Sequence, residues 1–339
     1  MMKITAKPFI LELKNPFGIS KNLRNSTDTI IVTIECDGFC GFGEASLPPY
    51  LIENQLSVLN FIKKINPVNI TYPFNFAVIH EYLDNLDHGN YAAKASIDIA
   101  LHDLQGKIEQ KALFQILDSN PEKMPYSAFT IGIGTPEVVI AKTKQANAFR
   151  YLKVKLGGED DDAMIKAIRS ISFKPLYIDV NEGWKEKRKA LDSIFRLRDD
   201  GAKLIEQPMP VQDLAETSWL SENSPIPIIA DEAFQIIDDL EKLQGVYKGV
   251  VVKLMKCGGI YPAKQIIEKS KKLDLKIMMG CMNESSCAIM AAAALAPFCN
   301  YADLDGPFLL TNNPYVDPKM GNGKIVLSKN PGLGLSSNS

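Results

Sequence analysis

The chain has 339 residues, of which 46% are hydrophobic and 23% are charged. At about 150 residues per domain, this length predicts two domains. The 38 Lys and Arg residues nearly balance the 40 Asp and Glu residues, so the net charge is −2. This balance argues against a nucleic-acid or anionic-membrane partner, which selects for a basic excess.

Apolar runs, the N-terminus and the cysteines together indicate where in the cell the protein is expected. No uninterrupted apolar run reaches the ~18 residues of a membrane span, and we find no signal peptide at the N-terminus. The six cysteines form no CxxC pair, which argues against a disulfide framework or a structural zinc site. We therefore expect a cytoplasmic protein.

The first 123 residues are expected to form an α+β domain. Thr29–Glu35 and Phe39–Glu44 alternate in polarity on either side of Asp37-Gly38, which predicts two strands joined by a tight turn. Amphipathic periodicity then predicts three helices, at residues 53–64, 76–86 and 92–107.

Residues 124–305 alternate short apolar runs with amphipathic helical stretches. The runs are apolar on both faces, as in buried parallel strands, and eight consecutive β-then-α units favour a barrel over an open sheet. We expect the remaining residues, 306–339, to return to the first domain and to include a strand-like piece at Lys324–Leu327. The eight predicted barrel strands are Ser127–Ile133, Tyr151–Leu156, Leu176–Val180, Lys203–Gln207, Ile226–Asp231, Gly249–Leu254, Lys276–Gly280 and Tyr301–Asp305.

Charged residues stand at the C-terminal ends of successive predicted strands, where barrel enzymes keep their active sites. From Lys155 to Lys253 the steps are 24, 27, 25 and 22 residues, about one β/α unit each. One such charge is easily a structural accident, because apolar runs end on polar residues. Six in register are hard to explain in that way. They are Lys153, Lys155, Asp179, Glu206, Asp231 and Lys253.

These residue types suit a hard metal ion and proton transfer. Three carboxylates from adjacent strands provide the oxygen ligands that Mg²⁺ prefers, with positions left for water or a substrate carboxylate. A zinc site would use His or Cys, and no His follows His102. Lys153 and Lys155 share one strand face, because side chains two residues apart point the same way.

The ordered segments KVK, DVN, IEQP, ADE and KLMKCGG resemble the enolase superfamily, in particular its muconate-lactonizing-enzyme-like subgroup, over essentially the whole chain. The resemblance implies an α/β protein with a modified (β/α)7β TIM-type barrel under an N-terminal α+β capping domain. It implies Mg²⁺ on Asp179, Glu206 and Asp231, which stabilises an enediolate formed by loss of the proton α to a carboxylate. It also implies that Lys155 and Lys253 act as acid/base groups, with Lys153 tuning Lys155.

The lysine pair leaves several reactions open. A mandelate-racemase-like His base is missing from the barrel half of the chain. Two lysines on opposite faces allow 1,1-proton transfer, but related enzymes use the same pair for cycloisomerisation or dehydration. The alternatives are o-succinylbenzoate synthase, N-acylamino acid racemase and muconate cycloisomerase, or a barrel that binds a metal or peptide without catalysis.

The segment NYADLDGPFLL separates these alternatives. Asp303 and Asp305 resemble the DxD motif of dipeptide epimerases, in which the two carboxylates bind the α-ammonium group of the dipeptide. A buried ammonium needs anionic acceptors to offset its desolvation. In the same family pattern, we expect Thr130, Cys281 and Asn283 to contact the substrate.

The loop from Gly18 to Asn25 is expected to select the substrate side chain. Relatives that act on Ala-Glu place an arginine here, but Arg24 stands about two positions late and Asn22 occupies the expected place. We therefore expect an L-Ala-L-Xaa epimerase with an apolar or small Xaa, with L-Ala-D/L-Glu epimerase as the alternative. A homo-oligomer is a further expectation. Glu232 is interpreted as a support for Asp231, and Lys256 as a loop residue.

Overall fold

The N-terminal sheet is an antiparallel meander of β1 (Lys3–Ile19), β2 (Asn22–Cys36) and β3 (Phe39–Leu47). It is seen in a computed structural model that describes residues 2–19, 22–158 and 160–338, without the side chains of residues 17, 19, 22 and 23. The predicted turn is confirmed, because Asp37 and Gly38 both adopt positive φ, 49° and 85°. The edge strand β1 was not predicted, because Pro8 and Pro16 interrupt its pattern.

Helix α3 (Tyr91–Glu109) packs along β3 and forms the centre of the capping unit. The approach is so close that a Cβ on Gly43 would lie 1.9 Å from the carbonyl oxygen of Ser96. The three predicted helices of this region are confirmed, one of them with the expected bounds, residues 76–86, and the other two with shifted ends. Around α3 lie α1 (Gln55–Lys64), η1 (Pro67–Asn69), α2 (Phe76–Leu86), α4 (Leu113–Ile116) and η2 (Pro121–Lys123).

The second unit is an eight-stranded parallel sheet whose strands follow one another in chain order. A bridge between Ser127 and Ala302 joins its first and last strands and closes the barrel. All eight predicted strands are present, most of them shorter than expected. They are β4 (Ala128–Ile131), β5 (Tyr151–Lys155), β6 (Leu176–Asp179), β7 (Ala202–Glu206), β8 (Ile228–Ala230), β9 (Gly249–Val252), β10 (Lys276–Met279) and β11 (Tyr301–Ala302).

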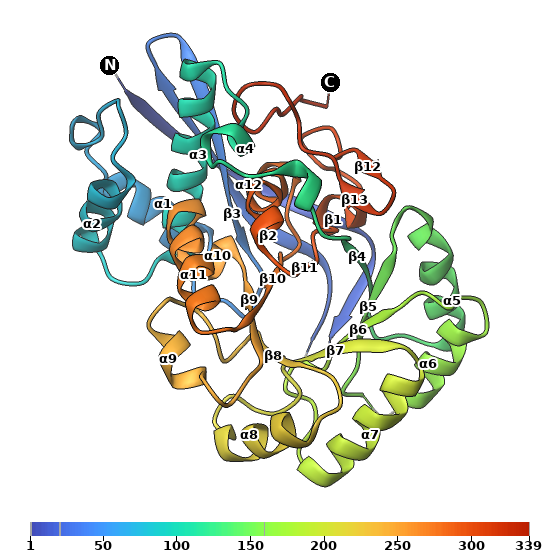
Figure 1. Ribbon diagram of the computed structural model, residues 1–339. Helices are drawn as coiled ribbons and strands as arrows, with labels where there is room; N and C mark the ends of the chain where they lie inside the picture. Colours follow the sequence, from blue (N-terminus) through green and yellow to red (C-terminus); the bar gives the residue numbers. More distant parts are fainter. Residues whose placement is uncertain (1, 20–21, 159, 339) are drawn as a thin grey trace.

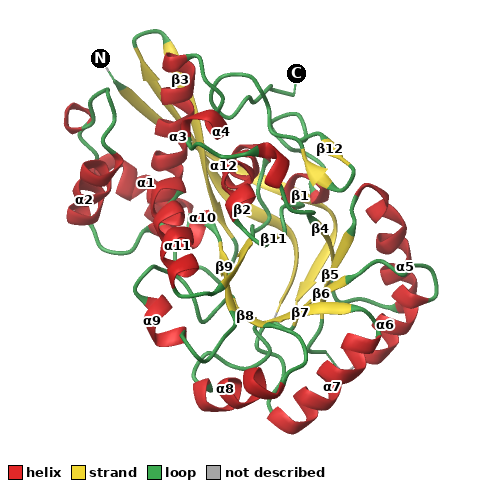
Figure 2. Cartoon of the chain, viewed as in Figure 1, coloured by secondary structure: helices red, strands yellow, loops and turns green. Residues whose placement is uncertain are grey.

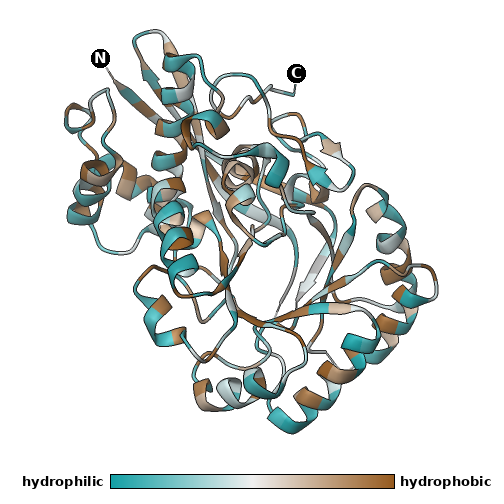
Figure 3. Ribbon diagram, in the orientation of Figure 1, coloured by the Kyte–Doolittle hydropathy of each residue, from teal (hydrophilic) through white to brown (hydrophobic). Residues whose placement is uncertain are grey.

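Helices cover the outside of the barrel (Figures 1 and 2). In α5 to α7 the apolar residues face the strands and the polar residues face outward (Figure 3), whereas every residue of α12 is buried. The pattern in α5 to α7 is the amphipathic one from which the sequence predicted helices. The elements that cover the barrel are α5 (Pro136–Gln145), η3 (Ala146–Ala148), α6 (Asp161–Arg169), α7 (Lys187–Asp199), α8 (Leu214–Asn223), α9 (Asp239–Leu243), α11 (Ile260–Lys272), α12 (Ser286–Leu295) and η4 (Ala296–Phe298). The short helix α10 (Leu254–Cys257) lies instead at the mouth of the barrel.

The C-terminal segment contacts both units. It contains η5 (Gly306–Leu309) and a small hairpin of β12 (Met320–Gly321) and β13 (Lys324–Ile325). The amide of Leu333 donates to Asp103 Oδ1 on α3 at 2.7 Å, and the amide of Ser127 donates to the carbonyl of Gly323 at 2.9 Å. None of the helices in the described ranges is long and apolar enough to cross a membrane.

Candidate active site

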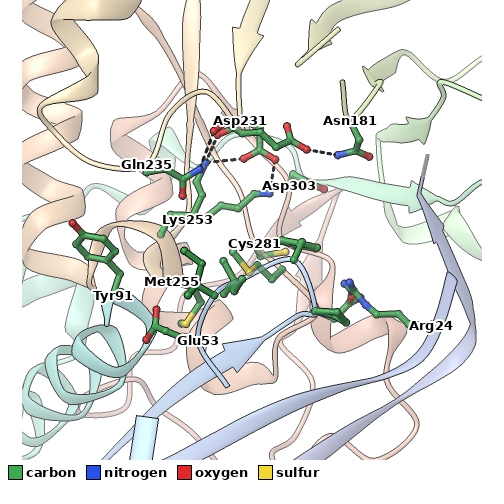
Figure 4. A pocket seen from close by; sticks show the side chains of 18 of the residues that line it. Arg24, Glu53, Tyr91, Asn181, Asp231, Gln235, Lys253, Met255, Cys281 and Asp303 are labelled. Atoms are coloured by element: carbon green, nitrogen blue, oxygen red, sulfur yellow. Dashed lines mark hydrogen bonds and ion pairs between the residues drawn. The ribbon is translucent and has the colours of Figure 1, made fainter. Parts of the chain in front are cut away.

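A cavity of about 890 Å³ lies between the barrel mouth and the capping unit, with lining residues from both (Figure 4). Because parallel strands all point the same way, their C-terminal ends converge on this mouth. The cavity reaches from Arg24, on the β1–β2 hairpin, to Glu53 and Tyr91 beside α1 and α3. One site therefore receives side chains from segments far apart in the sequence.

Three carboxylates meet at the ends of β6, β7 and β8. Oxygens of Asp179, Glu206 and Asp231 lie within 4.8 Å of one another, and none of the three residues is more than 4% exposed. Burial and the neighbouring Asp179 raise the pKa of Glu206 well above its ordinary value. Like charges held this close and away from water need cations to stabilise them.

Two lysines of β5 supply part of that positive charge. The Lys153 ammonium donates to Glu206 Oε1 at 2.9 Å and to Asp303 Oδ2 at 2.8 Å. The Lys155 ammonium donates to Asp179 Oδ2 at 2.5 Å. Burial alone would lower the pKa of Lys153, but the surrounding carboxylates outweigh it and raise that pKa well above its ordinary value. Lys153 is therefore a fixed cation.

Two more lysines reach the site from the end of β9. The Lys253 ammonium donates to Asp231 Oδ2 at 2.7 Å, and the Lys256 ammonium donates to Asp231 Oδ1, also at 2.7 Å. The expectation that Lys256 stays in a loop is wrong. The short helix α10 starts directly after Lys253, so one helical turn carries Lys256 back over the same carboxylate. Burial lowers the pKa of Lys256.

Two further acidic residues line the cavity beside Lys153. Asp303 and Asp305 follow β11 and are 3% and 2% exposed. Asp305 Oδ2 accepts from the amide of Thr130 at 2.6 Å, while Asp303 Oδ1 is buried with no hydrogen-bond donor among the described residues. Burial and the neighbouring Asp303 raise the pKa of Asp305 to about 7. This acidic pair can accept a cationic group.

The remaining wall is formed by the segment after β10 and by the hairpin of the capping unit. Cys281 and Asn283 both line the cavity. Asn283 Oδ1 accepts from the guanidinium of Arg24, which also lies 5.5 Å from the centre of the Tyr50 ring. Burial and Asp303 raise the pKa of the Cys281 thiol well above its ordinary value, so this thiol is no nucleophile at neutral pH.

The position of Arg24 differs from the residue count. Arg24 stands about two positions late in the loop, which favoured an apolar or small Xaa, yet it lies on the cavity wall. The reason is an irregularity in the β1–β2 pairing that brings Arg24 opposite Phe17. The side chain of Asn22, the residue at the expected place, lies outside the described part of the structure.

Two features of the site were not predicted. Tyr50 lines the cavity from the loop after β3, where its only sequence signal was the preceding Pro48-Pro49. Glu232 faces the cavity and accepts from Asn181 Nδ2 at 3.0 Å, and its pKa is raised to about 7 by burial and by Asp231. The expected support for Asp231 is therefore itself a wall of the cavity.

Comparison with known families matches both units of the chain. Residues 138–339 match the model described as "Enolase C-terminal domain-like". Residues 3–118 match the model of the mandelate racemase/muconate lactonizing enzyme N-terminal domain.

Individual relatives cover nearly the whole chain. An L-Ala-D/L-Glu epimerase of Bacteroides thetaiotaomicron is 44% identical over 98% of this chain and 88% of that protein. An L-Ala-D/L-amino acid epimerase of a Maribacter species is 34% identical over 99% of this chain and 100% of that protein. A crystal structure of a dipeptide epimerase from Enterococcus faecalis, complexed with Mg and L-Leu-L-Tyr, has a TM-score of 0.90 at 32% identity and covers 98% of both chains.

Proposed function

This chain belongs to the mandelate racemase/muconate lactonizing enzyme branch of the enolase superfamily, and we propose that it is a magnesium-dependent dipeptide epimerase. It inverts the α-carbon of the second residue of an L-Ala-L-Xaa dipeptide. One observation carries the proposal: a single cavity is lined by two facing lysines, a buried acidic pair and Asp231, the member of the three-carboxylate cluster that reaches the cavity. The relatives named above are epimerases of such dipeptides.

The carboxylate cluster fits a magnesium ion. Asp179, Glu206 and Asp231 offer only oxygen ligands, and their crowding away from water calls for a divalent cation. When bound there, Mg²⁺ supplies the charge that stabilises the enediolate of the substrate carboxylate. Asp179, Glu206 and Asp231 would hold the ion, while the Lys256 ammonium binds Oδ1 of Asp231 and fixes the position of that carboxylate.

The two proton-transfer lysines stand on opposite walls. Lys155 ends β5 and Lys253 follows β9, and these strands are four positions apart in a barrel of eight. A substrate α-carbon between them presents one face to each ammonium nitrogen. One lysine, in its neutral form, removes the α-proton, and the other returns a proton to the opposite face. Lys153 stays cationic among its carboxylates and takes no proton from the substrate.

The acidic pair supplies the site for the substrate ammonium. Asp303 Oδ1 lacks a donor among the described residues, and it is too buried for water to screen its charge. A dipeptide ammonium would provide that donor. A second carboxylate of muconate or succinylbenzoate would be repelled here, and an N-acyl group carries no charge with which to bind the two aspartates.

A second candidate concerns the side chain of Xaa. The residue count favours an apolar or small Xaa, but the Arg24 guanidinium reaches the cavity wall beside Asn283. A guanidinium there matches a substrate side-chain carboxylate, and the Bacteroides relative is named for Ala-Glu. We propose that L-Ala-L-Glu is a substrate of this chain and that apolar dipeptides compete with it less well.

A reduced cytoplasm and a homo-oligomeric assembly remain proposals from the sequence and the family. All six cysteines, each within the described residues, are free thiols, which is compatible with that compartment. Gel filtration with light scattering measures the assembly directly.

The first experiment is ¹H NMR in D₂O with Mg²⁺ and a panel of L-Ala-L-Xaa dipeptides. We expect loss of the second residue's α-proton signal and the growth of a new diastereomer, with EDTA abolishing both. N-acetyl-L-Glu and succinylbenzoate-type acids are run alongside as substrates without an ammonium group. If no dipeptide loses its α-proton signal while one of these acids does, the proposal is refuted.

A further inference from the structure

The β1–β2 hairpin that carries Arg24 is irregular at its stem. Regular pairing stops at Glu12 and Ser26 and resumes at Phe17 and Arg24. Residues 13–16 of β1 therefore face Asn25 alone on β2. Such a bulge frees backbone groups from the strand ladder and turns the rest of the strand in a new direction.

The barrel provides hydrogen-bond partners for the backbone of β1 at the bulge and just beyond it. The carbonyl of Pro16 accepts from the Lys142 ammonium at 3.1 Å. The carbonyl of Gly18 accepts from the amide of Ile133, also at 3.1 Å. The two backbones touch, because a Cβ on Gly132 would lie 3.0 Å from the Gly18 oxygen. The outer hairpin is thus seated on the segment between β4 and α5.

Lys142 is an unusual group for this position. It belongs to α5 and is 7% exposed, and no carboxylate among the described residues forms an ion pair with it. Burying an ammonium against a single carbonyl is costly, whereas an apolar side chain of similar length would be buried favourably. Packing alone therefore does not explain why a charged side chain occupies this buried position.

The hairpin leads from this contact to the pocket wall. Phe17, next to Pro16, pairs with Arg24, and the Arg24 guanidinium donates to Asn283 and lies over the Tyr50 ring. Movement of the stem would displace this guanidinium from the cavity.

We propose that Lys142 is a positioning residue that holds the β1–β2 hairpin on the barrel and so places Arg24 against Asn283. The inference rests on the proposed dipeptide epimerase activity and adds a determinant of substrate selectivity outside the cavity. Lys142 does not line the cavity. It therefore affects substrate binding only through the position of Arg24, and it takes no part in proton transfer.

The test compares Lys142→Met with Lys144→Met, because Lys144 is an exposed lysine on the same helix. With L-Ala-L-Glu, we expect Lys142→Met to raise KM about tenfold, the scale of one charged hydrogen bond, and to leave kcat within about twofold. Lys144→Met changes neither. In an Arg24→Met background, Lys142→Met has no further effect on KM, because both substitutions remove the same contact.

Hydrogen–deuterium exchange provides a readout that needs no activity. Amides of residues 9–19 exchange faster in Lys142→Met than in the wild type or in Lys144→Met, while barrel peptides are unchanged. If Lys142→Met does not fold, Lys142→Gln takes its place. Unchanged exchange and KM, or an equal fall in kcat for every dipeptide, overturns the proposal. Inactivity of the wild type on all dipeptides would instead refute the proposed function.

Discussion

The substitution Asp303→Asn tests the ammonium site most sharply. Asp303 Oδ2 accepts from Lys153 at 2.8 Å, and an asparagine oxygen can keep that bond. The substitution then places an NH₂ group where Oδ1 lies without a donor among the described residues. Shape and the Lys153 contact are preserved, while the negative charge facing the substrate is lost.

The expected loss follows from burial. Asp303 is 3% exposed, so water does not weaken its interaction with a bound ammonium. Hydrogen bonds to charged groups in such places contribute about 1.5–3 kcal/mol, which corresponds to about a 10- to 150-fold rise in KM for a dipeptide. We expect a rise in KM toward the upper end of this range, because the NH₂ group of the asparagine is a donor and faces the substrate ammonium, which is also a donor.

The assay is the rate of α-proton exchange by ¹H NMR in D₂O, measured over a range of L-Ala-L-Glu concentrations so that kcat and KM are obtained separately. Disturbance of Lys153, which contacts the carboxylate cluster, would lower kcat, whereas loss of the ammonium site raises KM. Asp162→Asn, at a carboxylate that is 72% exposed, serves as the matched control. An unchanged dipeptide KM in Asp303→Asn would refute the reasoning.

Three further predictions follow from the same structure. Lys253→Met should abolish epimerisation yet leave α-proton exchange with solvent in one diastereomer, which NMR resolves; exchange in both would contradict the two-lysine scheme. The pKa of Asp305 is about 7, and lower pH protonates it, so kcat/KM for dipeptides should fall steeply below pH 7. Asp305→Asn should remove this dependence, and a persisting profile would assign it elsewhere. Asp98→Ala should lower the free energy of unfolding by about 2–4 kcal/mol in urea titrations, because the Ile260 amide and His80 lose a buried acceptor.

Much of the fold was predictable because its signals are local. Parallel strands covered on both sides are apolar along their whole length, and their helices are amphipathic, so the repeating unit is visible in the sequence. The edge strand β1 was missed because an edge tolerates Pro8, which a strand pattern does not.

The sequence alone determined which residues gather at the centre of the proposed site. Lys155, Asp179, Glu206, Asp231 and Lys253 end consecutive strands, and a barrel brings all such ends to one mouth, whatever its helices contain. Chain order was therefore enough to place them together.

Tertiary structure decided the positions that no strand end controls. Lys256 reaches Asp231 through one turn of a helix only four residues long, which is too short to leave a periodic signal. Arg24 reaches the cavity because a bulge in β1 is held by Lys142, more than a hundred residues away in the chain. Such contacts depend on how the capping unit packs on the barrel, and residue spacing along the chain does not predict that packing.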